Sequence, residues 1–398
     1  PVTSAQITDA SVTAAKLADD SVTTDKIAAA NVTTAKIAGG SALVGKNVII
    51  NGAHTVDQRV AETRTGLGAA DFRLDDQWEL ISAGSSSSRW TASVETAAGP
   101  RDNSKWLKLL CTTGDASPGA AEAAYIRHVI EGQTGQSLMN TATTGVRDMT
   151  VSMYFIASLA SGSFPAKVCI SFATFDGTGR QFLSDQSITA ASTWQKISFT
   201  IPADATAELA NDTGAGAAIV IGLVGGSNSV AAEGWSANAT DFITSNTQNW
   251  GATADNFIGY TDVQLEPGPA ATEFEHEDIA ITRMKCERRL QRWTGSGSSG
   301  GGHIGQVIST TVAQVAIVFR QSFASTPAFS RSGTVGNFKA DYDATNIACS
   351  ALAQRTGTSS KEFDYLTATV GSAVFTVGEA ITLRLTGTAD FIQYSCEL

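Results

Sequence analysis

The first forty residues repeat one ten-residue pattern of hydrophobic and polar positions four times. In each copy a valine followed by threonine stands five positions before an isoleucine or leucine. The hydrophobic positions are Val2, Ile7, Val12, Leu17, Val22, Ile27, Val32 and Ile37. A spacing of five places the two residues on different faces of a helix and on opposite faces of a strand, and it is not a coiled-coil heptad. A single copy of this segment therefore cannot gather both residues on one face.

Parallel copies of the segment around one axis could bury these side chains, because the same valine and isoleucine would meet at every level. That burial would offset an ordering entropy that one chain cannot offset alone. We therefore predict that residues 1–40 form a fibrous shaft that trimerises through the eight hydrophobic positions. The alternative is a disordered linker rich in threonine and alanine. Because the sequence opens on Pro1 inside the array, we also expect a processed or partial form of a longer fibre.

Between residues 41 and 276 the pattern changes to short apolar runs, many of them alternating, separated by Gly, Ser, Asn and Asp. The runs predicted as strands are 47–52, 106–111, 124–130, 149–155, 168–172, 194–201, 218–223 and 257–265. Helical periodicity is nearly absent, so the pattern predicts an antiparallel β-sandwich of jelly-roll type. A polar segment, 227–255, interrupts the series and is too long for an ordinary connection.

The segment 277–302 is a predicted connector. Its first part, up to Trp293, is the most charged stretch of the chain and is expected to be a short helix or an edge strand. It ends in a Gly/Ser tract that reads as a flexible linker. From residue 303 to residue 398 alternation returns, which predicts a smaller C-terminal β-sandwich whose last strand is paired into a sheet. The predicted class is therefore all-β: shaft, jelly-roll sandwich, connector and second sandwich.

Composition and charge exclude several classes of protein. Charged residues make up 16% of the chain, against about 25% in an average globular protein. The net charge of −11 argues against nucleic-acid binding, which requires a basic surface. No hydrophobic run approaches the roughly 18 residues of a membrane-spanning helix, so no membrane insertion is expected. The five cysteines are widely spaced and favour buried free thiols and assembly in a reducing cytoplasm.

The sequence contains no recognisable catalytic or metal-binding motif, so we expect no enzyme activity, no metal and no cofactor. The four histidines lack metal-ligand spacing. Cleavage of a polysaccharide would require two carboxylates roughly 5–9.5 Å apart. The acidic residues considered for that role are Asp71, Asp75, Asp76, Glu79, Asp241 and Asp255. They read as ordinary loop and turn residues.

Carbohydrate binding fits the residue types better, because sugar rings stack on aromatic side chains and their hydroxyls bond to planar polar groups on loops. In the sandwich the candidates are Trp235, Asp241, Asn249 and Trp250. Each tryptophan has the alternative of anchoring its loop to the core. In the C-terminal part the candidates are Asp341, Tyr342 and Tyr365. These tyrosines have the alternative of facing inward from alternating strands.

Both ends of the predicted sandwich carry a family resemblance. NVIING at 47–52, followed by QR at 58–59, opens it; VQLEPG at 263–268 and ATEFE at 271–275 close it. Together they resemble the carbohydrate-binding-module-like sandwich of bacteriophage tail fibres. The decapeptide repeats are similar to those that precede such sandwiches, and 286–293 matches the following family segment loosely. The resemblance spans residues 1–293.

The resemblance implies a homotrimeric virion tail fibre, or receptor-binding protein, assembled in the host cytoplasm. Its expected partners are further copies of itself, other tail or baseplate proteins at the N-terminal end, and a host surface polysaccharide or outer-membrane component. Two alternatives stay open. The protein could be a purely structural spike or connector, or it could be a tailspike that degrades polysaccharide.

Overall fold

The computed structural model describes residues 45–59, 72–84, 89–102, 104–140, 145–237, 240–295, 302–343, 345–355, 357, 359–386 and 390–396. The chain divides into two compact units, one of Pro1–Gly45 with Thr272–Phe274, and one of Lys46–Ala271 with Glu275–Leu398. In the first unit the described residues are Gly45 and the irregular segment Thr272–Phe274. The predicted shaft and its eight trimer-core positions lie outside the described residues.

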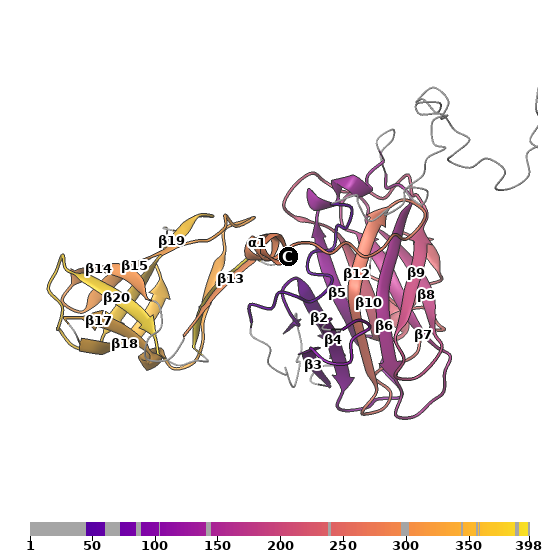
Figure 1. The fold of residues 1–398 in the computed structure, drawn as a ribbon, viewed down its shortest axis with the longest axis horizontal. Coiled ribbons are helices and arrows are strands. Elements are labelled where there is room, and N and C mark those ends of the chain that lie inside the picture. The colour runs from indigo at the N-terminus through magenta and orange to yellow at the C-terminus, as the bar shows by residue number, and fades with distance from the viewer. Residues whose placement is uncertain are drawn as a thin grey trace, which may run out of the picture. The chain divides into compact units, whose positions relative to one another are not determined.

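In the second unit, residues 46–271 form a sandwich of two antiparallel sheets (Figure 1). The larger sheet has the order β1-β2-β5-β10-β7-β8-β11. Its strands are β1 (Phe72–Arg73), β2 (Trp78–Ala83), β5 (Ala123–Glu131), β7 (Ala166–Thr174), β8 (Arg180–Ile188), β10 (Ala215–Gly225) and β11 (Gly234–Ser236). Two short 3-10 helices, η7 (Thr134–Leu138) and η8 (Ser227–Ser229), lie in the connections.

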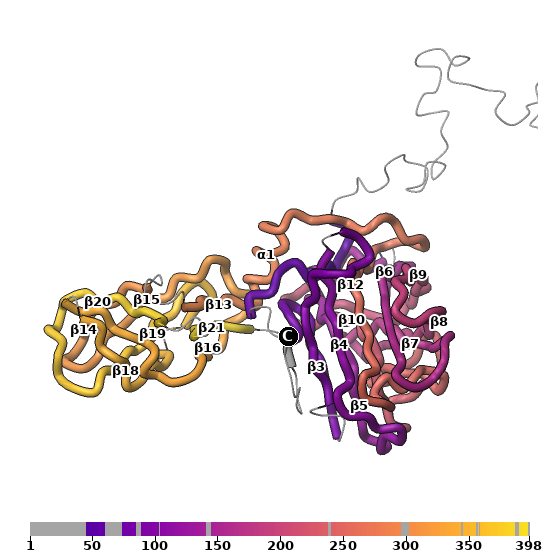
Figure 2. The backbone as a smooth tube through the Cα atoms, turned by 60° about the horizontal axis from the view of Figure 1, so that its bottom comes forward, coloured from indigo at the N-terminus to yellow at the C-terminus, as the bar shows by residue number. Residues whose placement is uncertain are grey.

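The smaller sheet has the order β3-β4-β12-β6-β9, and these strands lie side by side in Figure 2. They are β3 (Trp90–Glu95), β4 (Trp106–Cys111), β6 (Met149–Ser158), β9 (Gln195–Ile201) and β12 (Phe257–Pro267). The predicted runs from 106 onward all became strands. The first run, 47–52, did not; it is extended chain and a turn, and Val48 N donates to Leu265 O of β12 at 3.1 Å.

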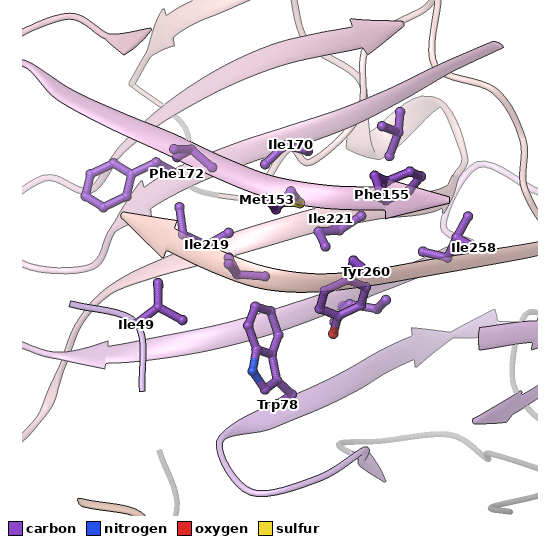
Figure 3. Close-up of a cluster of buried hydrophobic side chains, with 14 of the residues drawn as sticks. Ile49, Trp78, Met153, Phe155, Ile170, Phe172, Ile219, Ile221, Ile258 and Tyr260 are labelled. Carbon is purple, nitrogen blue, oxygen red and sulfur yellow. The ribbon is translucent and has the colours of Figure 1, made fainter. Parts of the chain in front are cut away.

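Hydrophobic side chains from the facing sides of the two sheets form one core (Figure 3). Ile219 and Phe172 come from the larger sheet, and Met153 and Tyr260 come from the smaller one. Because side chains alternate across a strand, the residues between them point away from the core. The same alternation therefore determines which residues of the larger sheet lie on its outer face.

A small group of polar side chains is enclosed at one side of this core. His54 Nδ1 lies 2.7 Å from the Asp75 carboxylate, and the ring packs against Tyr260. Burial lowers the pKa of His54 to about 3, so the ring is neutral at pH 7. Burial likewise lowers the pKa of His128 to about 4, and His128 Nε2 lies 3.0 Å from Ile50 O. Asp76 has a pKa raised by burial to about 7.

The C-terminal strands close into a barrel, whereas the sequence predicted a second sandwich. The barrel order is β14-β15-β19-β18-β17-β20 (Figure 1). Its elements are β14 (His303–Ser309), β15 (Val312–Val318), η9 (Val335–Asn337), β17 (Phe338–Tyr342), β18 (Thr345–Gln354), β19 (Phe363–Val370) and β20 (Ala380–Leu385). Closure pairs the outermost strands β14 and β20, which leaves no edge in this sheet. The all-β class is confirmed.

The predicted connector contains a helix and a strand, whereas the sequence had offered these as alternatives. Helix α1 (Ile279–Glu287) is capped at its N-terminus by Asp278, whose side chain accepts from Ala280 N at 2.7 Å. Strand β13 (Leu290–Thr294) then pairs with the last strand, β21 (Phe391–Ser395), which also pairs with β16 (Ala328–Arg331). The final strand is therefore held between two others, as predicted. The Gly/Ser tract at 296–301 lies outside the described residues.

All five cysteines are free, and four of them are buried. No helix in the described ranges is long and apolar enough to cross a membrane. Among the described side chains, no group of three or more His, Cys, Asp or Glu could hold a metal ion.

Candidate functional site

The outer face of the larger sheet carries a row of side chains from neighbouring strands. The register places Ile81 of β2 opposite Tyr125 of β5, and Tyr125 opposite Gly222 of β10. Further along, Ala173 of β7 lies opposite Gln181 of β8. Because directly opposed residues of paired strands point to the same side, these residues form one continuous surface.

The described parts of the long segment between β10 and β12, residues 226–237 and 240–256, cover part of this surface; we call them the covering loop. Its Phe242 ring stacks on Tyr125 with centroids 4.4 Å apart. A side chain at Gly222 would meet Phe242 O at 2.4 Å, so the absence of a Cβ there lets the loop backbone rest directly on the sheet. Thr244 Oγ1 donates to Asp185 of β8 at 2.6 Å and fixes the next part of the loop.

The uncovered part of the face forms a groove with a cavity of about 500 Å³. The residues that line it are Ile81, Ala83, Ala123, Tyr125, Arg127, Ala173, Phe175, Gln181, Val220, Asn228, Ser229, Thr240, Asp241 and Phe242. The floor comes from five adjacent strands and one wall comes from the covering loop. Small residues on the floor leave room, and Tyr125, Phe175 and Phe242 supply aromatic surface.

Gln181 is the polar group that stands out in the groove. Its residue is 1% exposed, and its amide nitrogen lies 3.4 Å from Ser171 Oγ. Its carbonyl oxygen is buried and has no hydrogen-bond partner within the described part of the protein. A buried acceptor without a partner costs on the order of 1–3 kcal/mol. A ligand with a hydroxyl or amide donor would satisfy it.

The groove carries charged groups of both signs. The Arg127 guanidinium pairs with Glu79, the residue opposite it on β2. Asp241 on the covering loop is the further carboxylate among the lining residues. With one arginine pair and one additional acidic residue, the lining offers both donors and acceptors without a strong positive potential.

The structure places the predicted sandwich residues in different environments. Asp241 lines the groove. Trp250 does not bind from the loop surface as proposed: it is 1% exposed and belongs to the core. Trp235 also packs inward, against Phe172 and Phe182, and its Nε1 donates to Pro202 O at 2.9 Å. Both tryptophans therefore take the anchoring role that was the alternative.

Asn249 is also structural. Its Nδ2 donates to Asp115 O at 2.9 Å, and its Oδ1 accepts from Gly251 N at 3.0 Å. These bonds fix the turn that delivers Trp250 to the core. A binding role for Asn249 would require breaking that turn.

The structure does not bring the three C-terminal candidates together. Asp341, on β17, forms an ion pair with Arg384. Tyr342 donates to Glu379 at 2.6 Å and packs against Phe375. Tyr365 lies on β19, separated from β17 by β18, with Phe363 beside it. They occupy different parts of the barrel surface and form no common site.

Sequence reasoning missed most of the groove. Tyr125 and Arg127 lie in a strand that was predicted, and their odd-numbered alternation on β5 marks them as outward-facing. Gln181 lies in β8, whose polar sequence did not read as a strand. The pairing of β8 with β7 was needed to place Gln181 beside the other residues.

Comparisons with known proteins give weak structural similarities. No protein-family model matches the sequence, and no curated protein matches it. The tailspike protein 4 enzymatically active domain of bacteriophage CBA120 is 10% identical, with a TM-score of 0.30, over 56% of this chain and 21% of that one. This chain therefore corresponds to about a fifth of the tailspike chain.

Several carbohydrate-binding modules are similar at the same level. A family 61 module in complex with β-1,4-galactotriose is 9% identical, with a TM-score of 0.26, over 56% of this chain and 99% of that one. A family 11 module from Clostridium thermocellum, in complex with a β-1,3-1,4-mixed-linked tetrasaccharide, is 11% identical, with a TM-score of 0.26, over 51% and 99%. The groove described above is defined by this chain's own residues.

Proposed function

We propose that the groove on the larger sheet binds carbohydrate, and that the protein attaches a virion to a polysaccharide on the host surface without cleaving it. The observation that supports the proposal most directly is the carbonyl oxygen of Gln181, which is buried without a hydrogen-bond partner among the described residues, in a groove lined by aromatic side chains. Sugars combine the two features that this groove would accept: hydroxyl donors and apolar C–H surfaces.

The chemistry of binding follows from the lining. Once the buried Gln181 side chain rotates toward the groove, a sugar hydroxyl would donate to its Oε1, and other hydroxyls would bond to Asp241 and Arg127. The aromatic rings of Tyr125 and Phe175 would contact the C–H surface of the sugar. A cavity of about 500 Å³ lies within the range of small-ligand sites.

The role as a virion tail fibre rests on the sequence. The family resemblance at both ends of the sandwich and the repeats before it support a homotrimeric fibre joined to other tail or baseplate proteins. Three copies of a weak sugar site would act together by avidity.

The test replaces Gln181 by methionine, which has nearly the same shape but no acceptor oxygen of this kind. Affinity for host surface polysaccharide, measured by titration calorimetry on the full chain, is expected to fall about tenfold, because one hydrogen bond to the ligand is lost. The melting temperature is expected to stay equal or to rise, since a buried unsatisfied oxygen is removed.

Gln186→Met is the matched control. Gln186 lies on the same strand, but on its opposite face, where it pairs with Val168 and donates to Ser184 Oγ at 2.8 Å. This variant should bind like the parent. Equal affinity of Gln181→Met and the parent would place the ligand elsewhere.

Two further measurements separate the alternatives. Incubation of the full chain with host polysaccharide should release no new reducing ends; release would make the protein a degrading tailspike. The full chain should also compete with virions for adsorption to host cells. If it neither competes nor binds polysaccharide, the protein is a structural component of the fibre.

A further inference from the structure

A second cavity, of about 460 Å³, lies between strand β13 and the barrel; we call it the basic pocket. The residues that line it include Arg292, Trp293 and Thr294 of β13, His303 of β14, and Arg320, which follows β15. No Asp or Glu is among the described residues that line it. The basic pocket shares no lining residue with the groove on the larger sheet, so the two sites can be tested separately.

The Trp293 ring holds two of these side chains in place. The guanidinium carbon of Arg320 lies 4.7 Å from the centroid of the ring. The His303 ring meets Trp293 edge to face, with centroids 5.6 Å apart. Cation–π and edge-to-face contacts favour one orientation of each side chain. The arginine and the histidine are therefore positioned before a ligand arrives.

Arg320 keeps donors for a ligand. Its Nε donates to Glu287 Oε1 at 2.8 Å, and its Nη2 donates to Gln58 Oε1 at 3.3 Å. Its Nη1, which carries two N–H groups, donates to no residue in the part of the chain that the structure describes. The guanidinium group can thus bind an acceptor in the basic pocket without giving up its protein contacts.

His303 supplies a second donor. The side chain is half-buried, yet its ring nitrogens form no hydrogen bond with any described residue. Burial and the positive charge of Arg320 lower the pKa of His303, so the ring is neutral at pH 7 and donates from one nitrogen. A neutral donor beside a charged one suits an oxyanion, which can accept from both.

The charges around the basic pocket favour an anion. Glu287 pairs with Arg320, but the same Oε1 accepts from Arg283 Nε at 3.0 Å, so one carboxylate serves two guanidinium groups. Arg292 brings a further guanidinium group, whose carbon lies 3.7 Å from the centroid of the Phe391 ring. On a chain with a net charge of −11, a local group of arginines attracts negative charge that the rest of the surface repels.

We propose that the basic pocket binds the carboxylate or phosphate group of an acidic sugar. The oxyanion would accept from Arg320 Nη1 and from the His303 ring, and Arg292 would add positive charge. The cavity is larger than a bare oxyanion requires and lies within the range of small organic ligands. That the sugar belongs to the host surface rests on the proposed function, whereas the anion site rests on the basic pocket alone.

The test is titration of the full chain, followed by saturation-transfer NMR, with three sugars of similar size. Methyl glucuronide carries a carboxylate, glucose 6-phosphate carries a phosphate, and methyl glucoside carries neither. At least one charged sugar should bind at least about tenfold more tightly than methyl glucoside, because its oxyanion forms charge-assisted hydrogen bonds. The tighter of the two identifies the anion. Equal affinity for all three sugars would overturn the proposal.

Two substitutions locate the anion. His303→Phe keeps the ring contact with Trp293 and removes both nitrogens, so affinity for the preferred charged sugar should fall about tenfold with an unchanged melting temperature. Arg320→Lys keeps the positive charge and removes the Nη1 donors, and it should weaken binding by a similar factor. If both variants bind the charged sugar like the parent, the proposal fails.

Two controls separate the basic pocket from other sites. Arg355→Lys makes the same change at an exposed barrel arginine outside the basic pocket and should bind the charged sugar like the parent. Gln181→Met, which tests the groove, should also leave this affinity unchanged. A loss in Gln181→Met but not in His303→Phe would place the anion in the groove and overturn the proposal. Failure of the groove itself shows instead as unchanged binding of host polysaccharide by Gln181→Met.

Discussion

At the scale of single residues, the sandwich core shows how burial controls protonation. His54 and His128 are enclosed by the rings of Trp78 and Tyr260, and burial lowers the pKa of both histidines well below 6.5. The stability that their neutral forms contribute is present above pH 6.5 and is lost as the pH falls through the folded pKa values. Asp76 acts in the opposite direction: its raised pKa contributes stability at low pH that is lost as the pH rises toward 7.

Between about pH 4.5 and 6, unfolding takes up a proton at each histidine and releases one from Asp76. The net uptake of one proton makes the unfolding free energy rise with pH by about 1.4 kcal/mol per unit from these three groups. His128→Gln removes one histidine, so its slope should be lower than that of the parent by about the same amount. Urea unfolding at several pH values measures both slopes.

The control is Gln306→Asn, an exposed substitution that changes no titratable group and should leave the slope unchanged. Parallel curves for His128→Gln and the parent would mean that His128 does not titrate differently in the folded and unfolded chains.

At the scale of elements, the covering loop is held on the sheet by three different anchors. Trp250 enters the core, Asp185 binds Thr244 and Thr247, and Gly222 lets Phe242 and Ile243 rest on β10. The loop is long because it crosses several strands before β12 begins. Its position, with Asp241 toward the groove, follows from the anchors on either side.

Gly222→Val is expected to lift the loop near Phe242, because the new Cβ would lie 2.4 Å from Phe242 O. The core should stay intact, since the residue faces outward. Hydrogen exchange measured by mass spectrometry should become faster in residues 240–244 and stay unchanged in β5 and β6. Affinity for polysaccharide should fall at least about tenfold, as one wall of the groove is lost.

The matched control is Gly336→Ala, in the barrel, where a Cβ meets no atom within 4 Å. Unchanged exchange in 240–244 of Gly222→Val would show that the loop is not held by this close approach.

At the scale of the whole molecule, the hydrophobic side chains form two large separate cores. Leu109 belongs to the sandwich core and Leu366 belongs to the barrel core. Two cores that share no buried residue should unfold in two steps, because each step exposes its own apolar surface.

Scanning calorimetry should therefore resolve two transitions. Leu366→Ala should lower the temperature of only one transition. The cavity left in the barrel reduces the unfolding free energy of the barrel by about 2–5 kcal/mol. Leu109→Ala should lower the temperature of only the other transition. One transition that moves with either substitution would show that the cores unfold together.

The sequence by itself determined the all-β class and most strands of the sandwich. Strands such as β4 and β12 were predictable because local alternation of apolar and polar residues is enough to define a half-buried strand. The same local pattern cannot show which strands become neighbours. Closure of the C-terminal strands into a barrel depends on the pairing of β14 with β20, whose residues are about 80 positions apart.

The candidate site was only partly predictable for the same reason. Asp241 was recognised, but whether a tryptophan such as Trp250 anchors a loop or contacts a ligand depends on what lies beneath the loop. Gln181 stands among polar residues in the sequence. Only the pairing of β7 with β8 buries it, with its carbonyl oxygen left without a hydrogen-bond partner in the part of the chain that the structure describes. The pattern of apolar and polar residues within each strand thus determined which side chains face outward. Tertiary packing decided which of these outward side chains meet in a groove.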